Sequence, residues 1–142
     1  MKPKLYQRIG TAIALVLVGA IAPTARAETI QIQPQFSPDP MVVEGRSGGA
    51  TNSECGYLGD TPNHVLEVGA DLPYLRISVE GTNNLSLLID GPGGRFCVLA
   101  DSYTEQGPEM SGLWTQGTYQ IYIGDRAGEA SDYRLYISHT PN

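Results

Sequence analysis

The chain has 142 residues and two cysteines, and its 15 acidic residues outnumber nine basic ones to give a formal net charge of −6. The 115 residues from Glu28 onward are enough for one domain with a real core and not for two. The acidic balance argues against nucleic acid and anionic membrane as partners, because binding to a polyanion depends on lysine and arginine.

The first 27 residues have the features of a cleavable signal peptide. They begin with a basic region made of Lys2, Lys4 and Arg8. Residues 9–22 form an apolar run shorter than the roughly 20 residues that a membrane span needs, and Ala25-Arg26-Ala27 is a small-x-small cleavage site. We therefore expect an exported protein, secreted or periplasmic, whose mature form starts near Glu28 and has no membrane span.

Removal of this signal makes the chain more acidic. Four of the nine basic residues leave with it, so five cations remain against 15 acids and the net charge becomes −10. All five are arginines: Arg46, Arg76, Arg95, Arg126 and Arg134. An excess of one charge of this size is typical of a small domain that must stay soluble.

The two cysteines, Cys55 and Cys97, are expected to form a disulfide, because export places them in an oxidising compartment. On the chain-entropy model a bridge across this separation stabilises the fold by about 4 kcal/mol. The alternatives are free thiols or a metal site, although a metal site uses more than two thiols at short spacing.

The segment 28–40 is rich in proline and glutamine, and its prolines at positions 34, 38 and 40 exclude a helix or a central strand. We interpret it as a linker or an edge element. A single sandwich domain is expected to cover residues 41–142, with a short strand at 41–44 and a Gly/Ser/Asn loop at 46–53.

The rest of the chain alternates apolar and polar residues with a period of two, which predicts half-buried antiparallel strands. The apolar positions are Leu75, Ile77 and Val79, then Leu85, Leu87 and Ile89, then Tyr119, Ile121 and Ile123, and finally Tyr133, Leu135 and Ile137. Residues 95–100 form a further strand, and 101–116 a longer polar connection. No helical period is present beyond the signal, so we predict an all-β, jelly-roll-like or Greek-key-like sandwich of about seven to nine short strands.

Two aromatic residues near the late strands have predicted structural roles. Tyr119, two residues after Gly117 at the start of a strand, is placed like the tyrosine corner of Greek-key sandwiches. Trp114 is expected to be a core plug or corner residue.

The stretch from about residue 66 to residue 138 resembles the bacterial pre-peptidase C-terminal domain. The matching motifs are Leu75-x-Ile77-x-Val79, Leu85-x-Leu87-x-Ile89-x-Gly91-Pro92-x-Gly94, Gly117-Thr118-Tyr119-x-Ile121-x-Ile123 and Tyr133-x-Leu135-x-Ile137. The resemblance implies a jelly-roll-like sandwich usually found beside secreted proteases as a targeting or secretion accessory. Some relatives bind calcium or an extracellular polymer, and they often carry paired acids shortly after the Gly-rich turn, where this chain has only Asp101.

A calcium site is therefore one hypothesis, since calcium needs six to eight oxygen ligands converging from turns. The candidate ligands are Asp90, Asp101 and Glu105 around one end of the sandwich, or Asp125, Glu129 and Asp132 in the loop before the last strand. The alternative is that these acids are solvated turn formers.

A serine-hydrolase motif is present only formally. Residues 45–49 satisfy G-x-S-x-G, with His64 or His139 as a conceivable base. The nucleophile elbow requires a strand-to-helix turn in an α/β sheet, which this chain is predicted to lack. We expect both histidines to be exposed and the protein not to be an enzyme, with a hydrolase kept as the least favoured alternative.

Outward-facing tyrosines and arginines are the best candidates for a binding surface. They are Tyr74, Arg76, Tyr122, Arg134 and Tyr136. Such side chains on a rigid sheet suit recognition of an extracellular polymer, an envelope component or a protein. The alternative is ordinary cross-strand pairing. The sequence thus favours an exported binding module, with a calcium-stabilised structural domain of the envelope as the second hypothesis.

Overall fold

The computed structural model of the protein describes residues 17–22 and 26–142. The predicted signal peptide at 1–27 falls largely outside these residues and stays a prediction. All regular elements of the described part are strands, which confirms the all-β prediction. Nothing helical in that part has the length and hydropathy to cross a bilayer.

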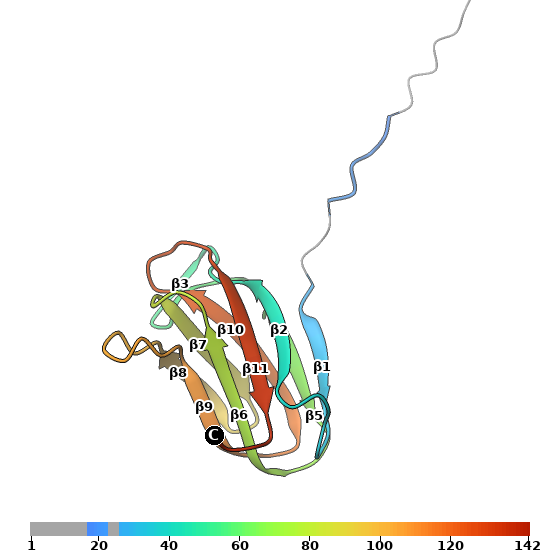
Figure 1. Ribbon diagram of the computed structural model, residues 1–142. Coiled ribbons are helices and arrows are strands. Elements are labelled where there is room, and N and C mark those ends of the chain that lie inside the picture. The colour runs from blue at the N-terminus through green and yellow to red at the C-terminus, as the bar shows by residue number, and fades with distance from the viewer. Residues whose placement is uncertain (1–16, 23–25) are drawn as a thin grey trace, which may run out of the picture.

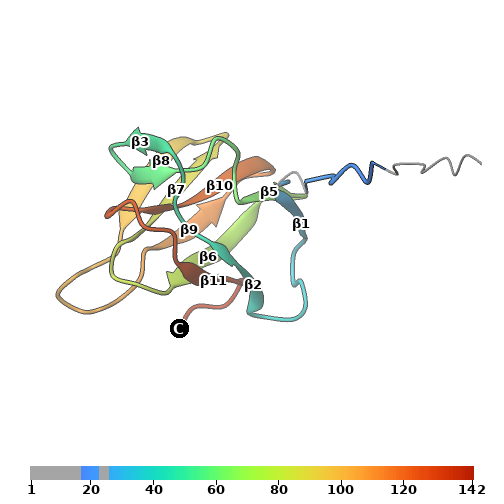
Figure 2. The same ribbon diagram turned by 90° about the horizontal axis from the view of Figure 1, so that it is seen from above.

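Within residues 17–22 and 26–142, eleven strands form two sheets that pack face to face (Figures 1 and 2). The larger sheet contains β1 (Glu28–Ile32), β3 (Thr51–Ser53), β4 (Gly56–Leu58), β5 (His64–Val68), β7 (Leu85–Gly91), β8 (Gly94–Leu99) and β10 (Gly117–Asp125). The smaller sheet contains β2 (Met41–Arg46), β6 (Leu72–Glu80), β9 (Glu109–Trp114) and β11 (Asp132–Ser138), in the order β2-β11-β6-β9. The architecture is a β-sandwich.

Strand β10 is the centre of the larger sheet. One of its edges pairs with β7, which in turn pairs with β8. Its other edge pairs first with β5 and then, at Asp125, with β4 of the short β3–β4 hairpin. Strand β1 lies outside β5 and pairs with it in parallel, whereas every other pairing of the described strands is antiparallel.

The strand count is higher than the seven to nine predicted. Strand β9 lies inside the stretch 101–116 that was expected to be a polar connection, because Gly112 and the exposed Leu113 hide its alternation. Strand β3 begins within the predicted loop 46–53. The sandwich also begins before residue 41, since β1 places Ile30 and Ile32 in the core as an edge element.

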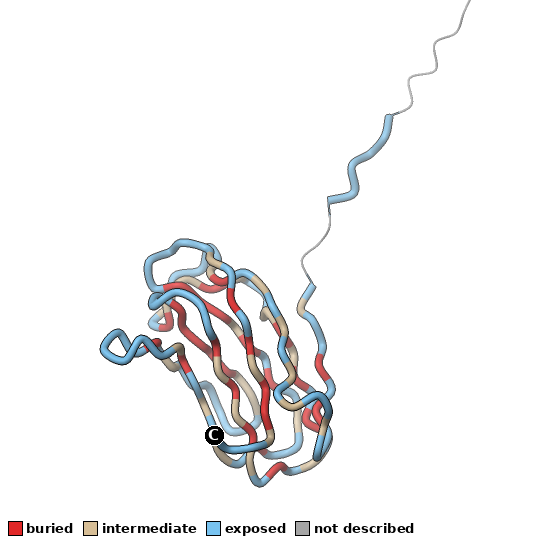
Figure 3. Tube along the Cα trace, viewed as in Figure 1, coloured by how far each residue is buried: buried red, intermediate tan, exposed pale blue. Residues whose placement is uncertain are grey.

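The core is built from residues of both sheets, and buried residues recur along the strands of each (Figure 3). The predicted alternation is confirmed, for Leu75, Ile77 and Val79 of β6 are buried while their neighbours face outward. Each fully buried side chain of this kind contributes roughly 1.5–3 kcal/mol of transfer free energy.

The two aromatic predictions near β10 also hold. The Tyr119 hydroxyl donates a hydrogen bond to the carbonyl of Thr115 at 2.8 Å, four residues upstream, which is the contact that defines a tyrosine corner. Trp114 is buried against Tyr119, with ring centroids 4.7 Å apart. These contacts fix the entry of the chain into β10.

Candidate functional site

The five outward-facing candidates lie on two opposite faces of the sandwich. Tyr74 and Arg76 belong to β6, and Arg134 and Tyr136 to β11, so these four share the outer side of the smaller sheet. Tyr122 belongs to β10 and points outward from the larger sheet. The period-two pattern predicts which side chains leave the core, but it does not say which sheet a strand joins.

On the smaller sheet, the polar side chains contact one another. Three contacts connect neighbouring strands: Arg134 Nε donates to Glu44 Oε1 at 3.1 Å, the Tyr136 hydroxyl donates to Glu80 at 2.9 Å, and Arg76 lies 3.7 Å from Glu109. This arrangement matches the alternative of cross-strand pairing for that face. Arg134, Tyr136 and the Arg76 guanidinium therefore have acidic partners on neighbouring strands of the sheet.

The outer side of the larger sheet is covered in part by the β3–β4 hairpin. The predicted disulfide is present, and it ties Cys55 of the hairpin to Cys97 of β8 with a Cα–Cα distance of 5.8 Å. The hairpin passes directly over Gly124 of β10, where an added Cβ would lie 2.7 Å from Leu58 Cδ2 and 2.9 Å from the Cys55 carbonyl oxygen. Ser86 donates a hydrogen bond to that same carbonyl. The hairpin therefore packs closely on the sheet, and the disulfide holds it in this position.

A groove of about 710 Å³ lies between this hairpin and strands β7, β8 and β10, and we call it the disulfide groove. Its floor is formed by Leu58, Leu88 and the half-buried ring of Tyr122, which pack together with Cys55. Its polar rim consists of Thr51, Ser53, Glu54, Asp60 and Arg95. Thr51 donates to Asp60 at 2.8 Å, and Arg95 lies 3.5 Å from Asp90. The groove joins an apolar floor to hydrogen-bonding and charged groups, which is the usual composition of a binding site.

The three preferred calcium ligands do not converge. In the β7–β8 hairpin Asp90 pairs with Arg95, whereas Asp101 follows Leu99, which pairs with Ser86. An antiparallel hairpin therefore places Asp90 and Asp101 at opposite ends, roughly 14 Å or more apart along the strands. The expectation that both lie with Glu105 at one end of the sandwich was wrong.

Asp101 has a local role that accounts for its carboxylate. It accepts hydrogen bonds from the Tyr103 amide at 2.8 Å and the Thr104 hydroxyl at 2.9 Å. These bonds lower the pKa of Asp101, and the bond from the Tyr103 amide has the largest effect. They organise the turn that contains Glu105, a turn that extends from the end of β8.

The second acidic loop is organised in a similar way. Asp125 is buried at the end of β10 and accepts from the amides of Ala127 and Glu129. Asp132 instead pairs with Arg46 at 2.8 Å. Within residues 17–22 and 26–142, no three His, Cys, Asp or Glu side chains form a group that could hold a metal ion.

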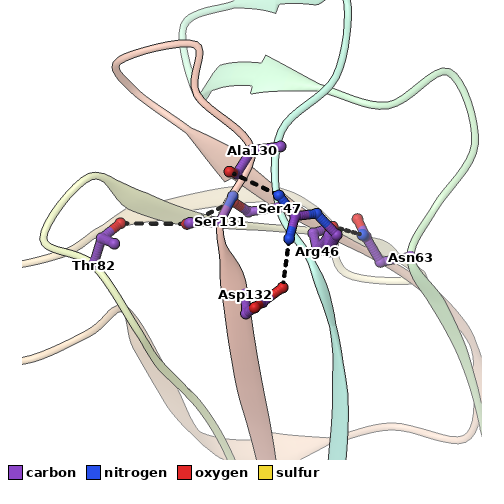
Figure 4. Close-up of polar contacts among 7 residues, drawn as sticks. All are labelled: Arg46, Ser47, Asn63, Thr82, Ala130, Ser131 and Asp132. Carbon is purple, nitrogen blue, oxygen red and sulfur yellow. Dashed lines mark hydrogen bonds and ion pairs between the residues drawn. The ribbon is translucent and has the colours of Figure 1, made fainter.

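The serine of the G-x-S-x-G motif, Ser47, takes part in contacts that join neighbouring strands (Figure 4). Ser47 is buried, and its hydroxyl lies 3.0 Å from that of Ser131 and accepts from the Ser131 amide. Beside it, Arg46 donates to Asp132 and to the Ala130 carbonyl. These contacts join β2 to the start of β11.

His64 is buried, with 3% of its surface exposed, so the expectation of an exposed histidine was wrong. Its Nε2 atom lies 2.8 Å from the Tyr133 hydroxyl, and its Nδ1 atom lies 3.5 Å from Glu28. Burial lowers the pKa of His64, and the Glu28 carboxylate offsets part of this effect. Burial also raises the pKa of Tyr133 to about 12. A usable signal was present, since His64 is in phase with the inward-facing Leu66 and Val68 of β5.

The Tyr133 ring reaches His64 by passing Gly45 of β2, where a Cβ would lie 2.7 Å from the ring atom Cζ. The motif glycine is therefore needed for packing. His139 is half-buried and stacks edge-on against Phe36 at 4.9 Å, and its backbone amide donates to Asp39. Among the described residues, neither histidine forms a hydrogen bond with Ser47.

No family model matches the sequence. The fold matches the pre-peptidase C-terminal domain of collagenase from Bacillus anthracis with a TM-score of 0.51 and 14% identity, covering 82% of this chain and 100% of that one. The predicted resemblance is thus confirmed for the fold, and the chain is a β-sandwich of the pre-peptidase C-terminal type. PliG of Salmonella Typhimurium, a periplasmic inhibitor of g-type lysozyme, matches with a TM-score of 0.46 and 11% identity over 80% of this chain and 98% of its own.

One curated relative is much closer in sequence. It is a Synechococcus elongatus protein described as Uncharacterized protein Synpcc7942_2126, which is 35% identical over 129 residues, or 88% of this chain and 94% of that protein. The chain belongs to the same protein family as this Synechococcus protein.

Proposed function

We propose that this protein is an exported, non-catalytic interaction module that binds its partner in the disulfide groove. The observation that supports this most directly is the composition of the groove. An aromatic and aliphatic floor lies beside a rim of hydroxyl and charged groups, and a covalent bond holds the wall in place. A site on a rigid sheet loses little conformational entropy when a partner binds.

Export is supported by two features. The disulfide Cys55–Cys97 is of the kind that persists in oxidising compartments outside the cytoplasm. The sequence pattern of residues 1–27 predicts a signal peptide. The proposed mature chain begins at Glu28, which is also the first residue of β1, so the proposed cleavage would leave the described sandwich intact.

The partner is an extracellular polymer, an envelope component or a protein. Of the three outward-facing tyrosines predicted as binding residues, Tyr122 lines the groove. The outer face of the smaller sheet supports binding less well, because its arginines already contact acids on neighbouring strands. We do not propose a calcium-stabilised domain, since the preferred ligands lie at different ends of the β7–β8 hairpin.

A retention experiment with two matched variants tests the groove. The purified protein is immobilised and exposed to envelope and extracellular fractions of the producing cells, and bound material is quantified. Tyr122→Ala removes the aromatic floor, whereas Tyr136→Ala removes an equal side chain from the opposite face of the sandwich. We expect retention by the wild type and by Tyr136→Ala, and its loss in Tyr122→Ala. Equal retention by both variants would contradict the proposed site.

A further inference from the structure

The rim of the disulfide groove has an excess of negative charge. Arg95 is the single cation among the lining residues, and it is compensated by Asp90 at 3.5 Å. Glu54 and Asp60 are exposed on the same rim, and within the described part of the chain neither contacts a cationic side chain. The groove therefore presents two carboxylates above an apolar floor.

The arginines of the smaller sheet do not offset this charge, because acids on neighbouring strands pair with them. Three other arginines form ion pairs on the smaller sheet, where Arg46 contacts Asp132, Arg76 contacts Glu109 and Arg134 contacts Glu44. Their charges are locally cancelled, whereas the chain as a whole has an excess of acids. Acidic rims on an acidic protein attract cationic partners and repel phosphate-bearing ones.

The strand beside the groove favours an extended peptide. Strand β8 contributes Arg95 and Cys97 to the lining, and it pairs with β7 and with no other described strand. Its second edge is therefore not hydrogen-bonded to any described strand. An extended peptide can use such an edge for main-chain hydrogen bonds while its side chains enter neighbouring pockets.

We propose that the partner held in the disulfide groove is a protein segment that carries both basic and apolar side chains. The inference rests on the proposed function and adds the chemistry of the ligand. A lysine or arginine side chain contacts Glu54 and Asp60 at the rim, and an adjacent apolar side chain packs on Leu58 and Leu88. The Tyr122 ring lines the same groove and would contribute a cation–π contact to the basic group.

Fluorescence anisotropy with a defined probe tests this inference. The probe is a short labelled peptide of alternating lysine and leucine, and the comparison ligands are the glutamate–leucine peptide and a neutral glucose oligosaccharide. We expect saturable binding of the lysine peptide that weakens as salt is added. The double variant Glu54→Gln/Asp60→Asn keeps the shape of the rim and should weaken binding about threefold to tenfold.

The control variant is Glu44→Gln/Glu80→Gln, which removes the same charge from the opposite face. We expect it to bind the lysine peptide like the wild type, and thermal melts should show that both double variants are folded. Equal weakening in the control would reduce the effect to net charge and overturn the inference. Absence of lysine-peptide binding, or tighter binding of either comparison ligand, would overturn it as well.

The outcome also separates this inference from the proposed function. If Tyr122→Ala abolishes retention of cellular material but the lysine peptide does not bind, the groove remains the site and its ligand is not a basic peptide. If Tyr122→Ala leaves retention unchanged, both proposals fail.

Discussion

The outer faces of the two sheets start from the same period-two pattern but end in different surfaces. On the smaller sheet, Arg134 stands directly opposite Glu44 on one neighbouring strand and Glu80 on the other, so opposite charges meet across the register. On the larger sheet, Leu88 and Tyr122 point outward; the disulfide-linked hairpin buries Leu88 and leaves Tyr122 half-buried in the groove. A face whose side chains satisfy one another stays exposed, whereas a face with apolar residues needs a cover.

This difference explains an unusual strand. Residues 85–89 of β7 are buried on both faces, because Leu85, Leu87 and Ile89 point into the core while Ser86 and Leu88 lie under the hairpin. The hairpin does not fill all the space above this face, and the space that remains is the disulfide groove. The covered face therefore supplies both stability and the candidate site, and the variants below distinguish the two faces.

The largest effect is expected from removal of the disulfide. A Cys55→Ser/Cys97→Ser variant frees a hairpin whose crosslink closes a 42-residue separation, so we expect the free energy of unfolding to fall by about 4 kcal/mol. Urea unfolding of the variant and of the oxidised wild type measures this difference. Reductant should destabilise the wild type and leave the variant unchanged. A loss below about 1 kcal/mol would show that packing alone holds the hairpin.

A methyl group at Gly124 should destabilise the packing of the hairpin on the same face while the disulfide stays intact. Its Cβ would overlap Leu58 and the Cys55 carbonyl, so Gly124→Ala should lower the free energy of unfolding by about 1–3 kcal/mol. Gly93→Ala is the matched control, because the only atom near its Cβ is a Phe96 ring carbon at 3.9 Å. Thermal unfolding compares the two. Equal melting temperatures would mean that the hairpin does not press on β10.

His64 makes the opposite edge of the larger sheet sensitive to acid. Its folded-state pKa lies below the value of about 6.5 that the ring has in an unfolded chain. The unfolded state therefore binds more protons as pH falls below 6.5, and this contribution to stability, complete above 6.5, is lost toward the folded-state pKa.

Unfolding free energies measured between about pH 7 and pH 5 should decrease toward acid, and the decrease should shrink in His64→Gln. Glu28→Gln should enlarge it, because the carboxylate that raises the pKa of His64 is removed. Ring resonances of His64 followed by NMR report the pKa directly. Stability that increases on acidification through this window would contradict the assignment.

Much of the sandwich could be predicted from local sequence. Alternation placed the inner face of β6, β10 and β11, and the offset between Gly117 and Tyr119 predicted the tyrosine corner. These features depend on residues close together in the chain. The disulfide could be predicted as well, because a chain with a predicted export signal and two cysteines has only one intramolecular pairing.

The site itself depends on contacts between distant segments, which the pattern does not encode. Whether Tyr122 and Tyr136 share a face depends on which sheet each strand joins. The burial of Leu88 depends on a hairpin more than 25 residues earlier in the chain. Asp90 and Asp101 lie near each other in sequence, and the antiparallel path of β7 and β8 still separates them.

The smallest effect is expected on the exposed face of the smaller sheet. Arg134 and Glu44 are both mostly exposed, so their 3.1 Å contact is screened by solvent. A double-mutant cycle with Arg134→Gln and Glu44→Gln should give a coupling of about 0.2–1 kcal/mol, and added salt should reduce it. Neither variant should change binding in the groove, since the pair lies on the other side of the core. A coupling above about 2 kcal/mol, or a change in groove binding, would mean that the two faces are not independent.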